Sequence, residues 1–139
     1  MALNHVIPGS TPASPANIEN FGGRMIDIGF LERDGFEEII SVIDRETGLD
    51  AYIAIHSTKL GPSLGGLRIW DYDTPEKHLK DCKRLAEGMT YKNSLAGLDL
   101  GGGKAVINLN GQKKTPEMLQ AFGEALNTLN GQYITAEDV

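Results

Sequence analysis

The chain has 139 residues, of which 40% are hydrophobic and 23% are charged, and its formal net charge at pH 7 is −6. This length suits one globular domain, while the negative charge and the lack of any run near ~20 apolar residues argue against a nucleic-acid surface, an anionic-membrane surface and a membrane span. The one cysteine, Cys82, excludes an internal disulfide framework and favours a reducing cytoplasm.

The first residues differ in composition from the rest of the chain. The tract from residue 8 to residue 15 contains three prolines and two serines, which disfavour both a helix and a central strand. We therefore expect residues 1–34 to form a flexible N-terminal arm, of which residues 25–30 can dock on the core or on a partner subunit. The folded domain is expected to span residues 35–139.

The next segments predict strands. Residues 38–44 and 49–56 are β-branched and apolar, and the polar residues 45–48 between them form a turn, so the pair predicts an antiparallel hairpin. Apolar and polar residues alternate again over residues 67–70, which predicts a third strand.

Two helices are predicted by the same opening pattern. Thr74-Pro75-Glu76 and Thr115-Pro116-Glu117 each provide an N-cap, a proline at the first helical position and an acid in the first turn. The apolar stripes that follow are Leu79, Cys82, Leu85, Ala86 and Met89 in the first helix, and Leu119, Phe122, Leu126 and Leu129 in the second. Asn130-Gly131 is the expected C-cap of the second helix.

A short strand is expected after each helix, at residues 104–109 and 133–135. An alternation of helix and strand implies right-handed crossovers and parallel pairing. The expected fold is therefore a three-layer α/β/α domain. Its sheet is expected to be mixed and largely parallel, with an N-terminal antiparallel hairpin.

The most informative motif is Gly101-Gly102-Gly103-Lys104, which lies twelve residues after Lys92. Each glycine costs about 0.5–1 kcal/mol relative to alanine inside an element, so we expect a turn whose bare backbone can lie against a small ligand. Both lysines lie beside apolar or glycine-rich sequence, which favours a chemical role. The alternative for Lys92 is a charge that complements the C-terminal end of a helix dipole.

Two catalytic motifs fit less well. A phosphate loop needs a glycine where Leu98 stands and a hydroxyl where Ala105 stands. Gly61-Pro62-Ser63-Leu64-Gly65 has the Gly-x-Ser-x-Gly spacing of a nucleophile elbow, but the elbow leads into a helix, whereas residues 67–70 indicate a strand. The only later histidine, His78, is expected on a helix surface. A serine hydrolase is therefore the second enzyme class.

Metal and thiol chemistry are not indicated. Cys82, His5, His56 and His78 have no spacing that would close a zinc site, so no metal is expected. Cys82 falls in the apolar helix stripe, which favours a small buried side chain over a catalytic thiol.

Four segments resemble the Glu/Leu/Phe/Val dehydrogenase family, and leucine dehydrogenase-like members most. They are residues 60–70 (LGPSLGGLRIW), 88–93 (GMTYKN), 100–104 (LGGGK) and 133–139 (YITAEDV). The resemblance implies NAD-dependent oxidative deamination of an L-amino acid to a 2-oxo acid and ammonia, in a homo-oligomer. It also implies two domains, with the substrate site and the subunit interface in the first. The second domain, which binds NAD, is expected beyond Val139, because no Gly-x-Gly-x-x-Gly occurs in this sequence.

The resemblance also implies roles for individual residues. Lys92 pairs with the substrate α-carboxylate, Lys104 is the catalytic lysine, and Asp138 acts beside it on the amino group and the attacking water. The remaining substrate-binding positions are Leu64, Gly65, Gly66, Met89 and Ala136. At the position that Leu64 matches, glutamate-specific members of the family carry a lysine. The resemblance therefore implies a branched-chain or aromatic substrate.

The proposed chemistry suits a lysine. A base that acts near neutrality needs a pKa near neutrality, and a second cation and desolvation both disfavour the charged form of a lysine side chain. The remaining alternative is a non-catalytic domain that binds a small molecule or a protein partner through the same cleft.

Overall fold

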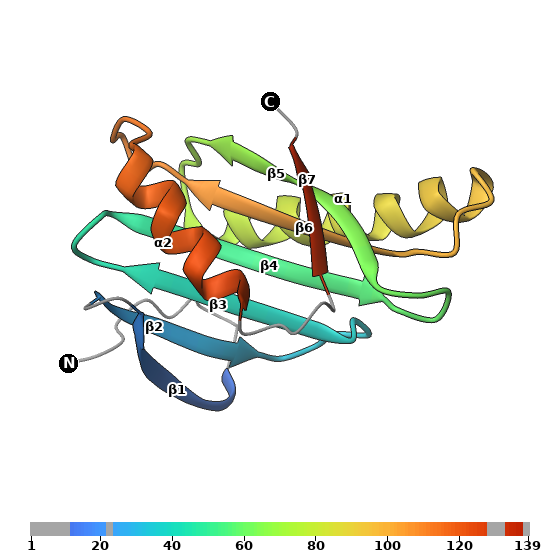
Figure 1. Ribbon diagram of the computed structural model, residues 1–139, viewed down its shortest axis with the longest axis horizontal. Coiled ribbons are helices and arrows are strands. Elements are labelled where there is room, and N and C mark those ends of the chain that lie inside the picture. Colours follow the sequence, from blue (N-terminus) through green and yellow to red (C-terminus); the bar gives the residue numbers. More distant parts are fainter. Residues whose placement is uncertain (1–11, 22–23, 128–132, 138–139) are drawn as a thin grey trace.

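The computed structural model describes residues 12–21, 24–127 and 133–137 and shows one sheet with a helix on each face (Figure 1). The strands follow the order β1-β2-β3-β4-β6-β5-β7 across the sheet. Their bounds are β1 (Pro12–Phe21), β2 (Arg24–Leu31), β3 (Glu38–Asp44), β4 (Leu49–Ser57), β5 (Ser63–Trp70), β6 (Gly101–Asn108) and β7 (Tyr133–Glu137). The helices are α1 (Pro75–Leu95) and α2 (Pro116–Leu126). The α/β class and the three layers are confirmed.

The sheet is mixed, as expected, but it is not largely parallel. The pairs β1–β2, β2–β3, β3–β4 and β4–β6 are antiparallel, and only β5–β6 and β5–β7 are parallel. Short connections join the strands of the N-terminal half, and such connections allow only antiparallel neighbours. The parallel pair β5–β6 is joined through α1, as a crossover requires. The predicted hairpin is confirmed as β3 and β4.

Within the predicted N-terminal arm, residues 24–31 dock on the core, which is one of the two options expected for residues 25–30. This segment is strand β2, whose residues 27–30 pair with β3. Ile26 and Ile28 are buried in the main core, and their alternation with Asp27 was the sequence pattern for a half-buried strand. The proline-containing β1 pairs with β2 at the edge of the sheet, with register shifts between Pro12 and Asn17. An edge is where a sheet tolerates proline.

Both helices begin at the predicted caps. The hydroxyl of Thr74 accepts from the backbone N–H of Lys77 at 3.2 Å, and that of Thr115 accepts from Met118 at 3.1 Å. Each proline occupies the first turn, where no helical N–H partner is lost. The C-cap of α2 is Asn127. Leu129 and the expected cap Asn130-Gly131 lie outside the described residues.

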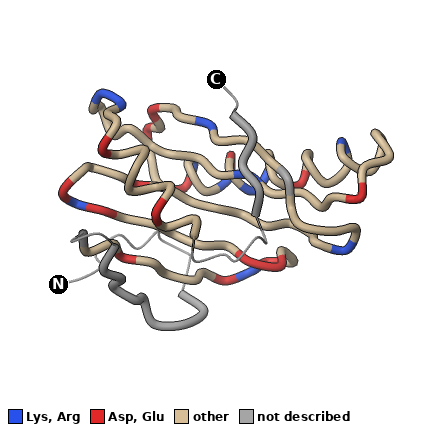
Figure 2. Tube along the Cα trace, in the orientation of Figure 1, with Lys and Arg blue, Asp and Glu red and all other residues tan. Residues whose placement is uncertain are grey.

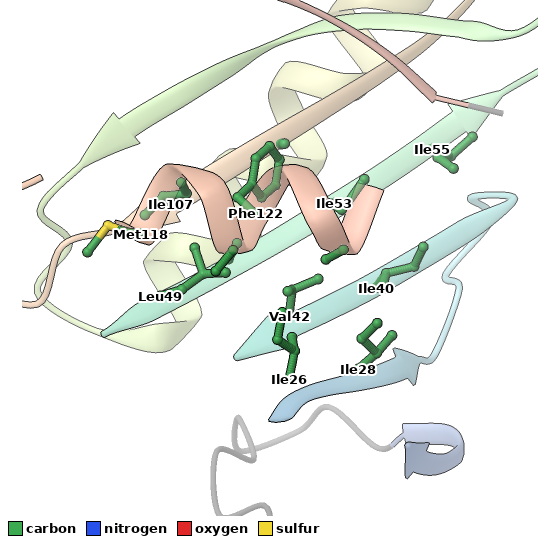
Figure 3. Close-up of a cluster of buried hydrophobic side chains, with 14 residues drawn as sticks. Ile26, Ile28, Ile40, Val42, Leu49, Ile53, Ile55, Ile107, Met118 and Phe122 are labelled. Carbon is green, nitrogen blue, oxygen red and sulfur yellow. The ribbon is translucent and has the colours of Figure 1, made fainter. Parts of the chain in front are cut away.

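The sheet separates two hydrophobic clusters. The cluster under α2 is made of aliphatic side chains with Phe122 and Met118, and it extends from β2 to β6 (Figure 3). The cluster under α1 is smaller and includes Tyr52 and Cys82 among its buried members. Along β4 the side chains alternate between the two, because Ile53 belongs to the α2 cluster and Tyr52 to the α1 cluster. This alternation defines an α1 side and an α2 side for every residue of the central strands.

Candidate functional site

The glycine run lies inside a strand, so the expected turn is wrong. Gly101, Gly102 and Gly103 are the first residues of β6, and all three are buried. A Cβ atom added at Gly102 would lie 2.1 Å from the backbone nitrogen of Thr90 on α1, far inside van der Waals contact. The absent side chain thus lets α1 lie directly on the strand that leads to Lys104.

Polar contacts fasten the last turns of α1 to the sheet. The side-chain amide of the buried Asn93 donates to the carbonyl oxygen of Gly101 at 2.6 Å. Nδ1 of His56, on β4, lies 2.8 Å from the hydroxyl of Thr90. These contacts hold the turn that carries Lys92. The sequence interpretation assigned no role to Asn93, although it directly follows Lys92 in the GMTYKN segment.

Both candidate lysines lie on the α1 side of the sheet. Lys104 is near the middle of β6 and only 6% exposed. Val106 belongs to the α1 cluster and Ala105 to the α2 cluster, so strand alternation directs Lys104 toward α1. Lys92 is exposed in the last turn of that helix, a position that also complements the helix dipole. Met89, one turn earlier, is half-buried.

Strand register aligns three candidate residues. Gly66 on β5 is the register partner of Ala136 on β7. The pairs Leu64–Gly102 and Leu67–Ala105 place Gly66 beside Lys104. Lys104, Gly66 and Ala136 therefore occupy neighbouring backbone positions on three parallel strands. Asp138, the predicted partner of Lys104, lies outside the described residues.

The strands in this row approach one another closely. A Cβ added at Gly65 would fall 1.5 Å from the carbonyl oxygen of Gly103. Leu64 occupies the neighbouring register position, paired with Gly102 on one side and Ile134 on the other. Glycine is required here by the approach of the next backbone, which explains its presence without a turn.

The serine-hydrolase alternative does not survive in the structure. Ser63 is buried at the start of β5, and the strand continues to Trp70 instead of turning into a helix. His78 was expected on the surface but is buried. Its Nε2 lies 2.8 Å from the carbonyl oxygen of Val106, and its ring stacks on Tyr72 with centroids 5.2 Å apart. No nucleophile elbow is formed.

Cys82 is a packing residue. Its side chain is fully buried, and the thiol lies 3.5 Å from the carbonyl oxygen of Tyr52 and 3.4 Å from that of Lys104. Burial raises the pKa of Cys82 to about 12, so the thiol stays protonated near neutrality and is a poor nucleophile.

Over the described ranges, no three His, Cys, Asp or Glu side chains gather as metal ligands, and neither helix has the length and apolar character to cross a membrane.

Comparisons with known proteins give one consistent family. Residues 37–139 match the profile described as Glu/Leu/Phe/Val dehydrogenase, dimerisation domain. The chain is 52% identical over 111 residues to leucine dehydrogenase of Bacillus subtilis, covering 79% of this chain and 30% of that protein. It is 49% identical over 109 residues to valine dehydrogenase of Streptomyces virginiae, covering 78% of this chain and 30% of that protein.

A solved structure agrees with these relatives. The crystal structure of L-tryptophan dehydrogenase from Nostoc punctiforme superposes with a TM-score of 0.72 at 45% identity, covering 76% of this chain and 32% of that one. The chain thus spans about a third of the length of the proteins it resembles. With the family profile matched over most of its length, the chain belongs to the Glu/Leu/Phe/Val dehydrogenase family.

Proposed function

We propose that the protein is an amino-acid dehydrogenase that oxidatively deaminates an apolar L-amino acid, and that residues 35–139 form its substrate-binding and dimerisation domain. The observation that carries the proposal is the row of Lys104, Gly66 and Ala136 on the neighbouring strands β6, β5 and β7, with Lys104 on the sheet face that is covered by α1, the helix that bears Lys92. The relatives named leucine and valine dehydrogenase support it, as does the structural neighbour named tryptophan dehydrogenase.

Each charged residue has a distinct role in the proposed reaction. The ammonium group of Lys92 pairs with the substrate α-carboxylate. Lys104, buried and held on a rigid strand, takes the proton from the water that attacks the iminium carbon. Asp138 holds the amino group and then the ammonia. A lysine on a strand keeps its Cα fixed while its long side chain reaches the substrate, which is the positioning that proton transfer needs.

The substrate side chain is proposed to be apolar. Leu64 and Ala136 match positions of the family's side-chain pocket, and neither residue type carries a charge or a side-chain hydrogen-bond donor. A carboxylate buried there would lose its hydration without gaining a partner, which costs several kcal/mol in order of magnitude. A branched-chain or aromatic amino acid avoids that loss.

NAD is the proposed hydride acceptor. The described residues do not fit a dinucleotide site, because the sequence contains no Gly-x-Gly-x-x-Gly and the glycine run is covered by α1 at Gly102. We therefore place the NAD site outside the described residues. The proposed assembly is a homo-oligomer, in line with the matched dimerisation-domain profile, and its proposed location is the cytoplasm.

Steady-state kinetics of the full-length enzyme test the proposal. Lys104→Ala is expected to lower kcat by about 100-fold or more, the scale of a lost general base, with little change in NAD binding. Lys92→Ala is expected to raise KM for the amino acid as well, because it removes the partner of the α-carboxylate. Lys114→Ala, at an exposed position in the loop before α2, is the matched control. Normal turnover in Lys104→Ala would refute the catalytic assignment.

A further inference from the structure

A second candidate site lies at the far end of the parallel strands from the glycine run. It is an open groove of about 360 Å³ between the end of β5 and the first half of α1, and Trp70 and Arg84 are among the residues that line it. Trp70 pairs in register with Asn108, the last residue of β6, whereas the glycine run begins that strand. The groove is therefore separate from the row that contains Lys104.

The groove is cationic although the chain as a whole is acidic. Four lining residues, Arg68, Lys77, Lys80 and Arg84, are basic, and Asp81 is the one acidic residue among them. In Figure 2 the basic positions of this region follow β5 and the part of α1 behind it. With a net charge of −6 over the chain, such a local excess of positive charge concentrates anions at the groove.

The single carboxylate organises the cations without neutralising the groove. Asp81 accepts hydrogen bonds from the hydroxyl of Tyr72 and from Nη2 of Arg84, the latter at 2.6 Å, and lies 3.5 Å from Nε of Arg68. Partial burial alone would raise the pKa of Asp81, but these hydrogen bonds and the two guanidinium charges outweigh it and lower the pKa. Asp81 is thus ionised near neutrality and fixes both arginines.

One cation remains uncommitted. Lys77 pairs with Asp73 at 3.0 Å, but Lys80 makes no ion pair with any residue that the structure describes. Lys80 is exposed and lines the same groove as the two held arginines. Guanidinium groups held in a fixed orientation can bind phosphate oxygens through two parallel hydrogen bonds, and a lysine adds a mobile positive charge.

An aromatic wall completes the groove. Trp70 is 55% exposed, and the guanidinium carbon of Arg68 lies 5.0 Å from its ring centroid. The exposed indole surface is available for stacking, because a planar ring gains contact with any π-face. From the joined cationic and aromatic surfaces, we propose that this groove binds a nucleotide, with its phosphates on Arg84 and Lys80 and its base on Trp70.

Binding can be followed at the groove itself, because Trp70 is the sole tryptophan of the chain. ATP, AMP and inorganic tripolyphosphate are titrated at low and at high salt, by tryptophan fluorescence and by calorimetry. We expect ATP to quench the fluorescence of Trp70 saturably and to bind more tightly than AMP. The affinity for ATP should fall as salt is added. Tripolyphosphate is expected to bind more weakly than ATP, because it lacks a base.

Variants at exposed positions identify the groove. Lys80→Gln and Arg84→Gln are each expected to weaken ATP binding by about tenfold, the loss of one charge-assisted contact. In calorimetry, Trp70→Phe is expected to weaken the binding of ATP more than the binding of tripolyphosphate. Lys59→Gln, exposed in the loop before β5, is the control and should bind ATP normally. Each of three results would overturn the proposal: no saturable ATP binding at low salt, equal affinity for ATP and tripolyphosphate, or unchanged binding in both Lys80→Gln and Arg84→Gln.

Discussion

At Gly65 a single added carbon would overlap the backbone of the next strand, since the nearest atom is the carbonyl oxygen of Gly103 at 1.5 Å. We predict that Gly65→Ala destabilises the protein by more than about 3 kcal/mol, because relief requires β5 and β6 to separate. Gly123→Ala is the matched control, in open space on the exposed face of α2, and should stabilise by about 0.5–1 kcal/mol. Urea unfolding of both variants measures the difference, and equal stabilities would contradict the close approach.

Cys82 gives a second prediction at the scale of one side chain. Its thiol is fully buried and its pKa is raised to about 12. A free thiol ionises near ~8.5 and reacts faster as the pH rises across roughly pH 7–9. Cys82 should remain protonated over that range, so alkylation of the native protein should be slow and follow the rate of unfolding. Fast alkylation that increases with pH, measured by mass spectrometry, would show that the thiol is accessible.

These residues also show where single positions escaped prediction. A turn was predicted for the glycine run because glycine destabilises the interior of a helix or strand. That argument did not consider a helix packed directly on the strand, which leaves no room for a side chain at Gly102. His78 was expected on a helix surface, yet Tyr52 and Tyr72 lie against its ring. In both cases the deciding neighbours are distant in the sequence.

At the scale of elements, α1 is tied to β6 by Asn93. Asn93→Ala leaves the buried carbonyl oxygen of Gly101 without this donor, and an unmade hydrogen bond of this kind costs about 1–3 kcal/mol. We predict that the free energy of unfolding, measured by thermal unfolding, falls by this amount. Amide exchange should accelerate first in the last turn of α1. Thr115→Ala, which removes the cap of α2, is a useful comparison, since it should cost about 1 kcal/mol and leave exchange in α1 unchanged. Protection of α1 equal to wild type in Asn93→Ala would mean that other contacts hold the helix.

The helices and most strands could be predicted because their patterns are local. The Thr-Pro-Glu openings start both helices at the right residue, β-branched apolar runs indicate β3 and β4, and alternation indicates β5. The order of the sheet could not be predicted in this way. Strand β6 inserts between β4 and β5, and that pairing depends on contacts between segments about 50 residues apart. The family resemblance indicates the residues of the candidate site, whereas the contacts of Asn93 and Thr90 depend on how α1 packs on β4 and β6.

At the scale of the whole molecule, one sheet contributes side chains to both hydrophobic clusters. Phe122→Ala removes a large buried side chain from the α2 cluster and should cost about 3–5 kcal/mol. Trp70 lies at the end of β5, away from that cluster. We nevertheless predict that tryptophan fluorescence and far-ultraviolet circular dichroism report the same urea midpoint in this variant, as two-state unfolding requires. Separate midpoints would show that the α1 side unfolds independently of the α2 side.

The two faces of the sheet differ in the kinds of residues that they bury. The α2 cluster is built from aliphatic residues with Phe122 and Met118, whereas the α1 side buries Lys104, His78 and Cys82 and carries the basic groove. The larger hydrophobic cluster therefore lies on the face opposite the candidate ligand-binding residues. Substitutions on the α1 side can therefore change the residues available to a ligand while the core of the opposite face stays intact.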